Sequence, residues 1–134
     1  MYQEAPNSFS NKWNREVFDF LQMYSAHSDV TEILVKSTNR LGDVQTYCPD
    51  SSKFRYVVVS TKDIIFGFAI GMDLTAFRLC PVLRKRALVT GGELITGLSE
   101  EWVGFTLFRA DWPEVDSAFW ARQAYINVRE KMKL

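Results

Sequence analysis

Residues 54–80 carry three successive stretches rich in β-branched and aromatic side chains, and these constrain the fold more than any other feature of the chain. Residues 54–61 form the first stretch, Lys62 and Asp63 interrupt it, and residues 64–72 resume the same character. Residues 74–80 then alternate, with only Arg78 at an unexpected position. Such side chains are typical of strands, and a two-residue polar break is typical of a hairpin. The sequence therefore predicts three central strands in an antiparallel arrangement.

Two glycines lie within the second of these stretches. Gly67 and Gly71 fall inside a predicted strand rather than before a helix, and Gly91 with Gly92 lacks the Lys and Ser/Thr that follow in a phosphate-binding loop. Neither pair indicates a nucleotide site. Glycine inside a strand instead indicates a bulge, a bend, or a helix that crosses the sheet closely.

Before residue 54 the pattern predicts a helix and then a hairpin. Apolar side chains from Trp13 to Tyr24 recur at helical spacing, and the polar residues 25–29 favour the end of that helix. Residues 30–37 alternate, with Ile33 and Val35 on one side, and residues 39–43 have turn composition that includes Gly42. We therefore expect a strand over residues 30–37 that pairs with a returning strand over residues 44–48.

After residue 80 the pattern predicts a short helix, a strand and a long helix. Pro81 fits the first turn of a helix over residues 82–89, and Gly91 fits its C-terminal cap. Residues 102–108 read as a last strand, and residues 111–114 give a capping signal for the final helix. The core face of that helix should carry Ala118, Ala121, Tyr125, Val128 and Met132.

This order of elements predicts an α+β fold. We expect one antiparallel sheet of five to six strands, packed by the N- and C-terminal helices, with a short helix between the last strands. The simplest arrangement places the helices on one face and leaves the other face partly open. At 134 residues the chain should form a single domain over residues 1–134 with one core, and residues 1–10 read as a loose tail.

Charge and cysteine content restrict the function classes. Sixteen basic and sixteen acidic side chains cancel, which disfavours a dedicated nucleic-acid binder. Cys48 and Cys80 lack CxxC spacing and read as free thiols in a reducing cytoplasm. The N-terminus lacks the pattern of a signal peptide, and the longest apolar stretch, residues 64–72, is too short to span a bilayer. We expect a cytoplasmic protein without membrane association or cofactor.

The sequence offers few candidates for catalysis. His27 is the single histidine, and its position at the end of the first predicted helix is typical of a C-terminal cap. Cys48 and Cys80 each precede a proline at a predicted strand end. Arg78 and Arg84 lie close enough in sequence to activate the Cys80 thiol, but a buried, inert thiol is the simpler interpretation of both cysteines. We expect no catalytic and no metal-binding residue.

Candidate binding residues are mostly basic. Arg84, Lys85 and Arg86 form the one compact basic cluster, although consecutive helical residues point about 100° apart and so do not share a face. Several carboxylates surround the last predicted strand: Glu100, Glu101, Asp111, Glu114 and Asp116. A series of aromatic side chains begins in that strand and continues into the final helix, and it fits a groove lining or, more simply, the core: Trp102, Phe105, Phe108, Trp112, Phe119, Trp120 and Tyr125.

A recognisable order of segments occupies residues 54–131. It consists of the strand pair FRYVVVSTKDIIFGFAIGM, the strand LTAFRLCP, the short helix VLRKRALVTGG, the segment EEWVGFTLF and the helix DWPEVDSAFWARQAYINVREK. This order resembles the small bacterial domains of the YjbR type and the N-terminal domain of the competence regulator TfoX. The resemblance implies an α+β sandwich with a regulatory or interaction role in bacteria, which includes DNA binding in some cases, and it transfers no catalytic residue.

Three functional hypotheses follow. The first is a non-enzymatic domain that binds a protein partner or a second copy of itself, as a homodimer would. The second is a nucleic-acid-associated module that uses Arg84, Lys85 and Arg86 together with Arg55, Arg78 or Arg109. The third is a small-ligand binder, with an aromatic pocket between sheet and helices in which Arg78 or Tyr56 fixes the ligand.

Overall fold

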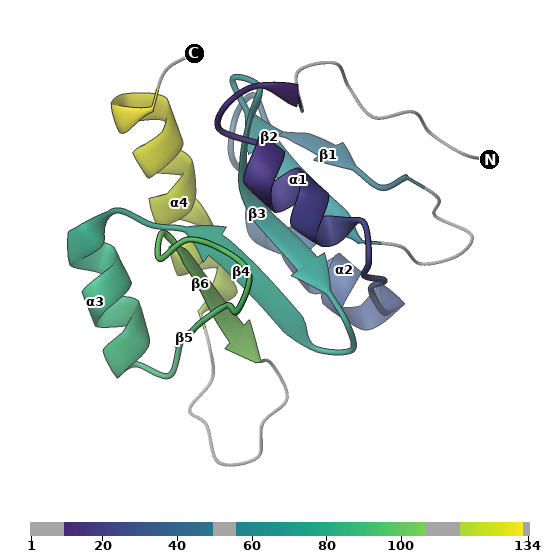
Figure 1. The fold of residues 1–134 in the computed structure, drawn as a ribbon. Coiled ribbons are helices and arrows are strands. Elements are labelled where there is room, and N and C mark those ends of the chain that lie inside the picture. Colours follow the sequence, from purple (N-terminus) through teal and green to yellow (C-terminus); the bar gives the residue numbers. More distant parts are fainter. Residues whose placement is uncertain (1–9, 50–55, 107–115, 133–134) are drawn as a thin grey trace.

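The computed structural model describes residues 10–49, 56–106 and 116–132, and it has an α+β architecture (Figure 1). Four helices and six strands follow one another along the chain: α1 (Arg15–Leu21), α2 (Ser28–Thr38), β1 (Gln45–Tyr47), β2 (Val57–Thr61), β3 (Ile64–Ile70), β4 (Leu74–Arg78), α3 (Pro81–Val89), β5 (Glu93–Leu94), β6 (Trp102–Thr106) and α4 (Ser117–Lys131). The predicted fold class is thus confirmed.

The six strands form one antiparallel sheet in the order β1-β2-β3-β4-β6-β5. Its centre is the predicted hairpin of β2 and β3. Lys62 and Asp63 both have left-handed backbone angles, with φ of 51° and 64°. Two such residues in succession form the type I′ turn that matches the twist of paired strands, which explains why a two-residue break suffices here.

A β-bulge in β3 explains one of the strand glycines. Val59 pairs with Gly67 but Ser60 pairs with Ile65, so Phe66 is an extra residue in the ladder. A Cβ atom on Gly67 would lie 3.1 Å from side-chain atoms of both Phe77 and Val59. Glycine therefore suits the position beside the bulge because a side chain there would crowd these two core residues.

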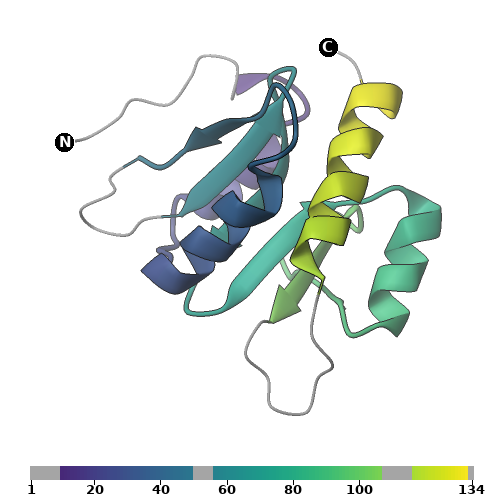
Figure 2. The same cartoon turned by 180° about the vertical axis from the view of Figure 1, so that it is seen from behind.

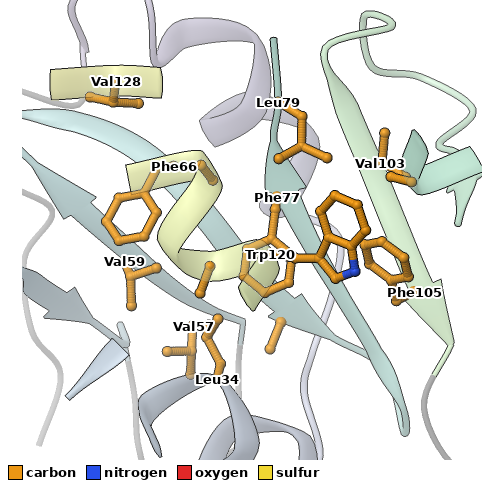
Figure 3. Packing of buried hydrophobic residues seen from close by; sticks show 14 of the residues in the cluster. Leu34, Val57, Val59, Phe66, Phe77, Leu79, Val103, Phe105, Trp120 and Val128 are labelled. Carbon is orange, nitrogen blue, oxygen red and sulfur yellow. The ribbon is translucent and has the colours of Figure 1, made fainter. Parts of the chain in front are cut away.

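Helices α2, α3 and α4 cover one face of the sheet, as the view from behind shows (Figure 2). Trp120 of α4 lies at the centre of this face, where its ring stacks on Phe105 with centroids 5.4 Å apart (Figure 3). Leu34 of α2 and Phe77 of β4 are fully buried in the same cluster. Packing of large aromatic and branched side chains holds these helices on the sheet.

Helix α1 covers the opposite face, so the expectation of helices on one face only is wrong (Figure 1). Val17 and Leu21 of α1 are fully buried in a second cluster that contains Phe68 and Trp102. Most side chains of the central strands β2 and β3 are apolar on both faces, so both faces need a cover. The alternation expected of a half-exposed sheet is absent from these two strands, all of whose residues are buried.

Residues 30–37 form most of α2 and not a strand, which corrects the predicted first hairpin. Val30, Leu34 and Thr38 are the buried residues of the helix, and their spacing of four places them on one face. The alternation of Ile33 and Val35 that predicted a strand covers only a few residues, whereas the helical spacing runs from Val30 to Thr38. The predicted returning strand does exist as β1, but it pairs with β2 at the edge of the sheet.

His27 begins a helix and does not end one. Its Nδ1 accepts a hydrogen bond from the Asp29 backbone N–H at 3.1 Å, so it is the N-cap of α2. The predicted C-terminal cap at His27 is therefore wrong, because α1 already ends at Leu21. The His27 side chain is exposed at this position, where it caps the helix.

Other boundaries differ by small amounts. Strand β5 has two residues and no sequence signal predicted it. Helix α4 is capped by Asp116, whose side chain accepts from the Phe119 backbone N–H at 2.9 Å. The capping signal predicted over residues 111–114 and the tail predicted over residues 1–10 lie outside the described residues, except for Ser10.

Candidate functional site

Arg78 is a structural residue in the interior and not an accessible ligand contact. Its side chain is 0% exposed, and its guanidinium lies over the Trp102 ring at 4.7 Å from the centroid. One nitrogen donates to the Trp13 carbonyl at 2.9 Å and the other lies 3.4 Å from Glu101 Oε1. Arg78 thus ties the start of α1 to the sheet, and no site opens around it.

The electrostatics of Arg78 agree with that role. Burial lowers the pKa of Arg78 to about 10, while the carboxylates of Glu101 and Glu16 act in the opposite direction. The guanidinium consequently stays protonated at neutral pH and its charge is matched by nearby acids. A buried, paired cation of this kind positions backbone rather than binding a metabolite.

Tyr56 is also a core residue. It is 1% exposed, and its hydroxyl accepts a hydrogen bond from Gln22 Nε2 at 3.1 Å. Its ring contacts Tyr47 and, edge-on, Phe18. The third hypothesis placed Arg78 and Tyr56 in a ligand pocket between the sheet and the terminal helices. In this structure both residues are buried, and neither side chain is accessible to a ligand.

The basic cluster lies on α3, where its members differ in surroundings. Lys85 and Arg86 are exposed, whereas Arg84 is half-buried and lies 3.9 Å from Glu100. Ala87 on the same helix faces the core, which fixes the direction in which the helix presents its polar side chains. The structure does not bring Arg78 to this surface, and Arg55 and Arg109 lie outside the described residues.

No disulfide joins Cys48 and Cys80, and each is half-buried. Cys80 precedes α3 as its N-cap residue without a side-chain hydrogen bond to the helix. Among the described residues, no group of three or more His, Cys, Asp and Glu side chains is placed to hold a metal ion. Nor does any helix in the described part of the chain have the length and apolarity needed to cross a membrane.

The described surface has a groove between α2 and α4, which we call the α2–α4 groove. Residues 36–42, from the last turn of α2 and the loop after it, form one side, and residues 116–126 of α4 and its cap form the other. Its volume is about 1080 Å³. The two helices lie side by side on the same face of the sheet (Figure 2), so the groove has a rigid base.

Two guanidinium groups lie on the two sides of this groove. Arg40 follows α2 and Arg122 lies on α4, and both are exposed. Neither forms an ion pair or hydrogen bond with any described residue. Lys36, which also lines the groove, is instead paired with Glu32 at 2.8 Å, an interaction that raises the pKa of Lys36 and lowers that of Glu32.

An aromatic side chain joins the groove to the core. Phe119 is 36% exposed, and its ring meets the Trp120 ring edge-on with centroids 4.9 Å apart. Leu41, Ala118 and Ile126 add further apolar surface to the lining. The groove thus combines a firmly supported apolar area with cationic groups at its sides, a composition that is typical of binding surfaces for protein segments.

One end of the groove is held together by contacts between its two sides. The Tyr125 hydroxyl donates to the Gly42 carbonyl at 2.6 Å. Beyond it, Arg129 donates to Asp43 Oδ2 at 3.2 Å and to the Thr61 hydroxyl at 2.8 Å. These bonds fix the loop that carries Arg40 against α4, so the groove exists before anything binds.

Sequence reasoning did not identify the groove residues Arg40 and Arg122. The obstacle was the assignment of residues 30–37 to a strand, which placed Arg40 in a hairpin turn far from the last helix. The signal that would have found them is the spacing of Val30, Leu34 and Thr38, because a helix there must pack beside α4. Phe119 and Tyr125 were named as candidates for a groove lining, and the structure places both there.

Comparison of the chain with protein-family models, with curated proteins and with solved structures finds no match. The resemblance to the YjbR-type and TfoX N-terminal domains accordingly stays a prediction.

Proposed function

We propose that this chain is a non-enzymatic, cytoplasmic interaction domain that holds a peptide segment of a partner protein in the α2–α4 groove. The observation that carries the proposal is the exposed Phe119 ring, which lies in a groove with a preformed, apolar lining. Exposed aromatic side chains that are rigidly supported contribute disproportionately to protein binding. Support by Trp120 reduces the entropy that Phe119 loses when a partner covers it.

The shape of the groove favours a chain segment over a small metabolite. Small-ligand sites enclose most of the ligand surface, and their volumes range from about 300 to 1,000 Å³. The α2–α4 groove is at least as large, at about 1080 Å³, but it is open along the surface. A peptide that passes through such a groove buries a long strip of its surface without needing to be enclosed.

Two alternatives have less support. The basic cluster on α3 favours a nucleic-acid role only weakly, because Arg84 is paired with Glu100 and the net charge of the chain is zero. A second copy of the chain is another possible occupant of the groove. Self-association would appear as a concentration-dependent molar mass in sedimentation equilibrium, and would be lost in a variant with a filled groove.

Selection from a displayed random peptide library tests the proposal. Ala118 lines the groove and is exposed, so Ala118→Trp fills the groove without a change of charge. Val82→Trp places the same side chain on the exposed surface of α3 and is the matched control. We expect peptides that bind the wild type and Val82→Trp alike and bind Ala118→Trp about tenfold more weakly. Enrichment of no peptide, or equal binding to Ala118→Trp, would refute the proposal.

A further inference from the structure

We infer that the partner segment is acidic, with a large apolar side chain flanked by carboxylates. This inference rests on the proposed function and adds the chemistry of the partner to it. Arg40 and Arg122 have no acidic partner among the described residues, and they lie on the two sides of the same groove.

The other charged groups of the groove are already engaged. Lys36 is paired with Glu32 at 2.8 Å. Asp116 is the one acidic side chain among the lining residues that the structure describes, and it accepts the hydrogen bond that caps α4. Within residues 10–49, 56–106 and 116–132, the groove consequently presents two guanidinium groups that no carboxylate contacts. A guanidinium binds a carboxylate through two parallel hydrogen bonds, which makes acidic side chains the complementary groups of a protein partner.

The apolar lining of the groove favours an apolar side chain between the carboxylates of the partner segment. Phe119 and Ile126 lie on α4 and Leu41 lies on the opposite side. A segment composed of acidic residues alone would leave this apolar surface in contact with water. A large apolar side chain removes it from water, at about 25 cal/mol for each Å² that is buried.

A polyanion such as duplex DNA fits these observations less well. Its binding depends on many phosphate contacts, and affinity falls steeply with salt in proportion to their number. The groove offers the exposed guanidinium groups of Arg40 and Arg122 beside an apolar surface, whereas the exposed cations Lys85 and Arg86 lie on α3. An acidic peptide matches both the charge and the apolar area.

Fluorescence anisotropy with labelled synthetic peptides tests the inference. The probe is a short peptide with Leu and Phe between runs of Asp and Glu, and the reference peptide carries Asn and Gln in place of the acids. We expect wild type to bind the acidic probe about tenfold more tightly than the amide reference, and added NaCl to reduce this difference. Equal binding of the two peptides would overturn the inference.

Charge reversal locates the interaction. In the double variant Arg40→Glu and Arg122→Glu, both changes are at exposed positions, and we expect the affinity for the acidic probe to fall about thirtyfold. The matched control reverses Lys85 and Arg86 on α3, which are equally exposed, and should alter the affinity less than about twofold. An equal loss in both double variants would show a general charge effect and contradict the inference.

The outcomes separate the two proposals. If the library yields neutral or basic peptides that depend on the groove, the interaction domain stands and the acidic partner is refuted. If a labelled DNA duplex binds wild type and loses affinity on reversal of Arg40 and Arg122, while the acidic probe does not bind, the acidic-peptide inference is overturned in favour of nucleic acid. If neither the library nor the probe binds, both proposals fail.

Discussion

The two faces of the sheet are covered in different ways. On one face, α2 and α4 are held by apolar packing around Trp120, Leu34 and Phe77. On the other face, the seven-residue α1 buries Val17 and Leu21 and packs Phe18 and Phe20 against the same cluster. Polar contacts from Asn14 and Arg78 add to this packing. Asn14 and Arg78 are both fully buried, so their hydrogen bonds are shielded from water. The comparison teaches that buried polar side chains can position a short helix together with its apolar packing.

Substitution of Trp120 should have the largest effect, because it removes the centre of the face that depends on packing. We expect Trp120→Ala to reduce the free energy of unfolding by about 3–5 kcal/mol. Urea denaturation followed by circular dichroism measures the loss. Phe119→Ala, one residue away and partly exposed, is the control and should cost less than half as much. Equal losses would show that the packing centre lies elsewhere.

Arg78→Ala tests the face that depends on polar contacts. We expect a loss of about 2–3 kcal/mol, because the Trp13 carbonyl and Glu101 lose a charged hydrogen-bond donor. Hydrogen exchange should speed up in α1 and far less in α2. Arg78→Lys keeps the charge without the planar fork, so it should restore part of the stability. Uniformly faster exchange in both helices would contradict the division between the two faces.

Asn14→Ala sharpens the same comparison at a single amide group. The Asn14 side chain accepts from the Ile65 backbone N–H and donates to the Asp63 carbonyl, both at 2.8 Å. Its removal leaves a buried N–H without this partner, so we expect a loss of about 1–2 kcal/mol. The chemical shift of the Ile65 amide in NMR spectra reports the broken bond. Unchanged stability would mean that water replaces the side chain.

Tyr125→Phe should have the smallest effect on stability, about 0.5–1 kcal/mol, since its hydroxyl contact lies near the surface. We expect Tyr125→Phe to weaken peptide affinity by more than this loss of stability, because the hydrogen bond to Gly42 positions the loop that carries Arg40. Isothermal titration with a peptide selected on the wild type measures this. A variant that binds as tightly as wild type would show that the loop needs no such restraint.

The regularity of each segment determined how much of this fold the sequence could predict. The hairpin of β2 and β3, the strands β4 and β6 and the helix α3 follow patterns that strong local preference enforces, and all were predicted. Residues 30–37 were not, because Ile33 and Val35 alternate locally while the helical period of Val30, Leu34 and Thr38 extends over a longer window. Helix position relative to the sheet depends on tertiary contacts such as Arg78 to Trp13, which no local pattern contains.

The candidate site was less predictable than the fold. Arg78, Tyr56 and the basic cluster at Arg84 were predicted as contacts because their side chains are chemically distinctive. Arg78 and Tyr56 are buried, and the basic cluster lies on α3, outside the α2–α4 groove. Arg40 and Arg122 are ordinary in sequence and are distinctive only because α2 and α4 meet. Their separation along the chain means that the groove is a property of the helix pair and not of a motif.

The outer strands of the sheet restrict how other chains can approach. Strand β1 has three residues and β5 has two. An incoming strand could form only a few main-chain hydrogen bonds along either border, so growth of the sheet by addition of further chains is disfavoured. The described part of the domain is thus open to recognition through side chains while it resists the strand-by-strand accretion that leads β-rich proteins toward fibrils.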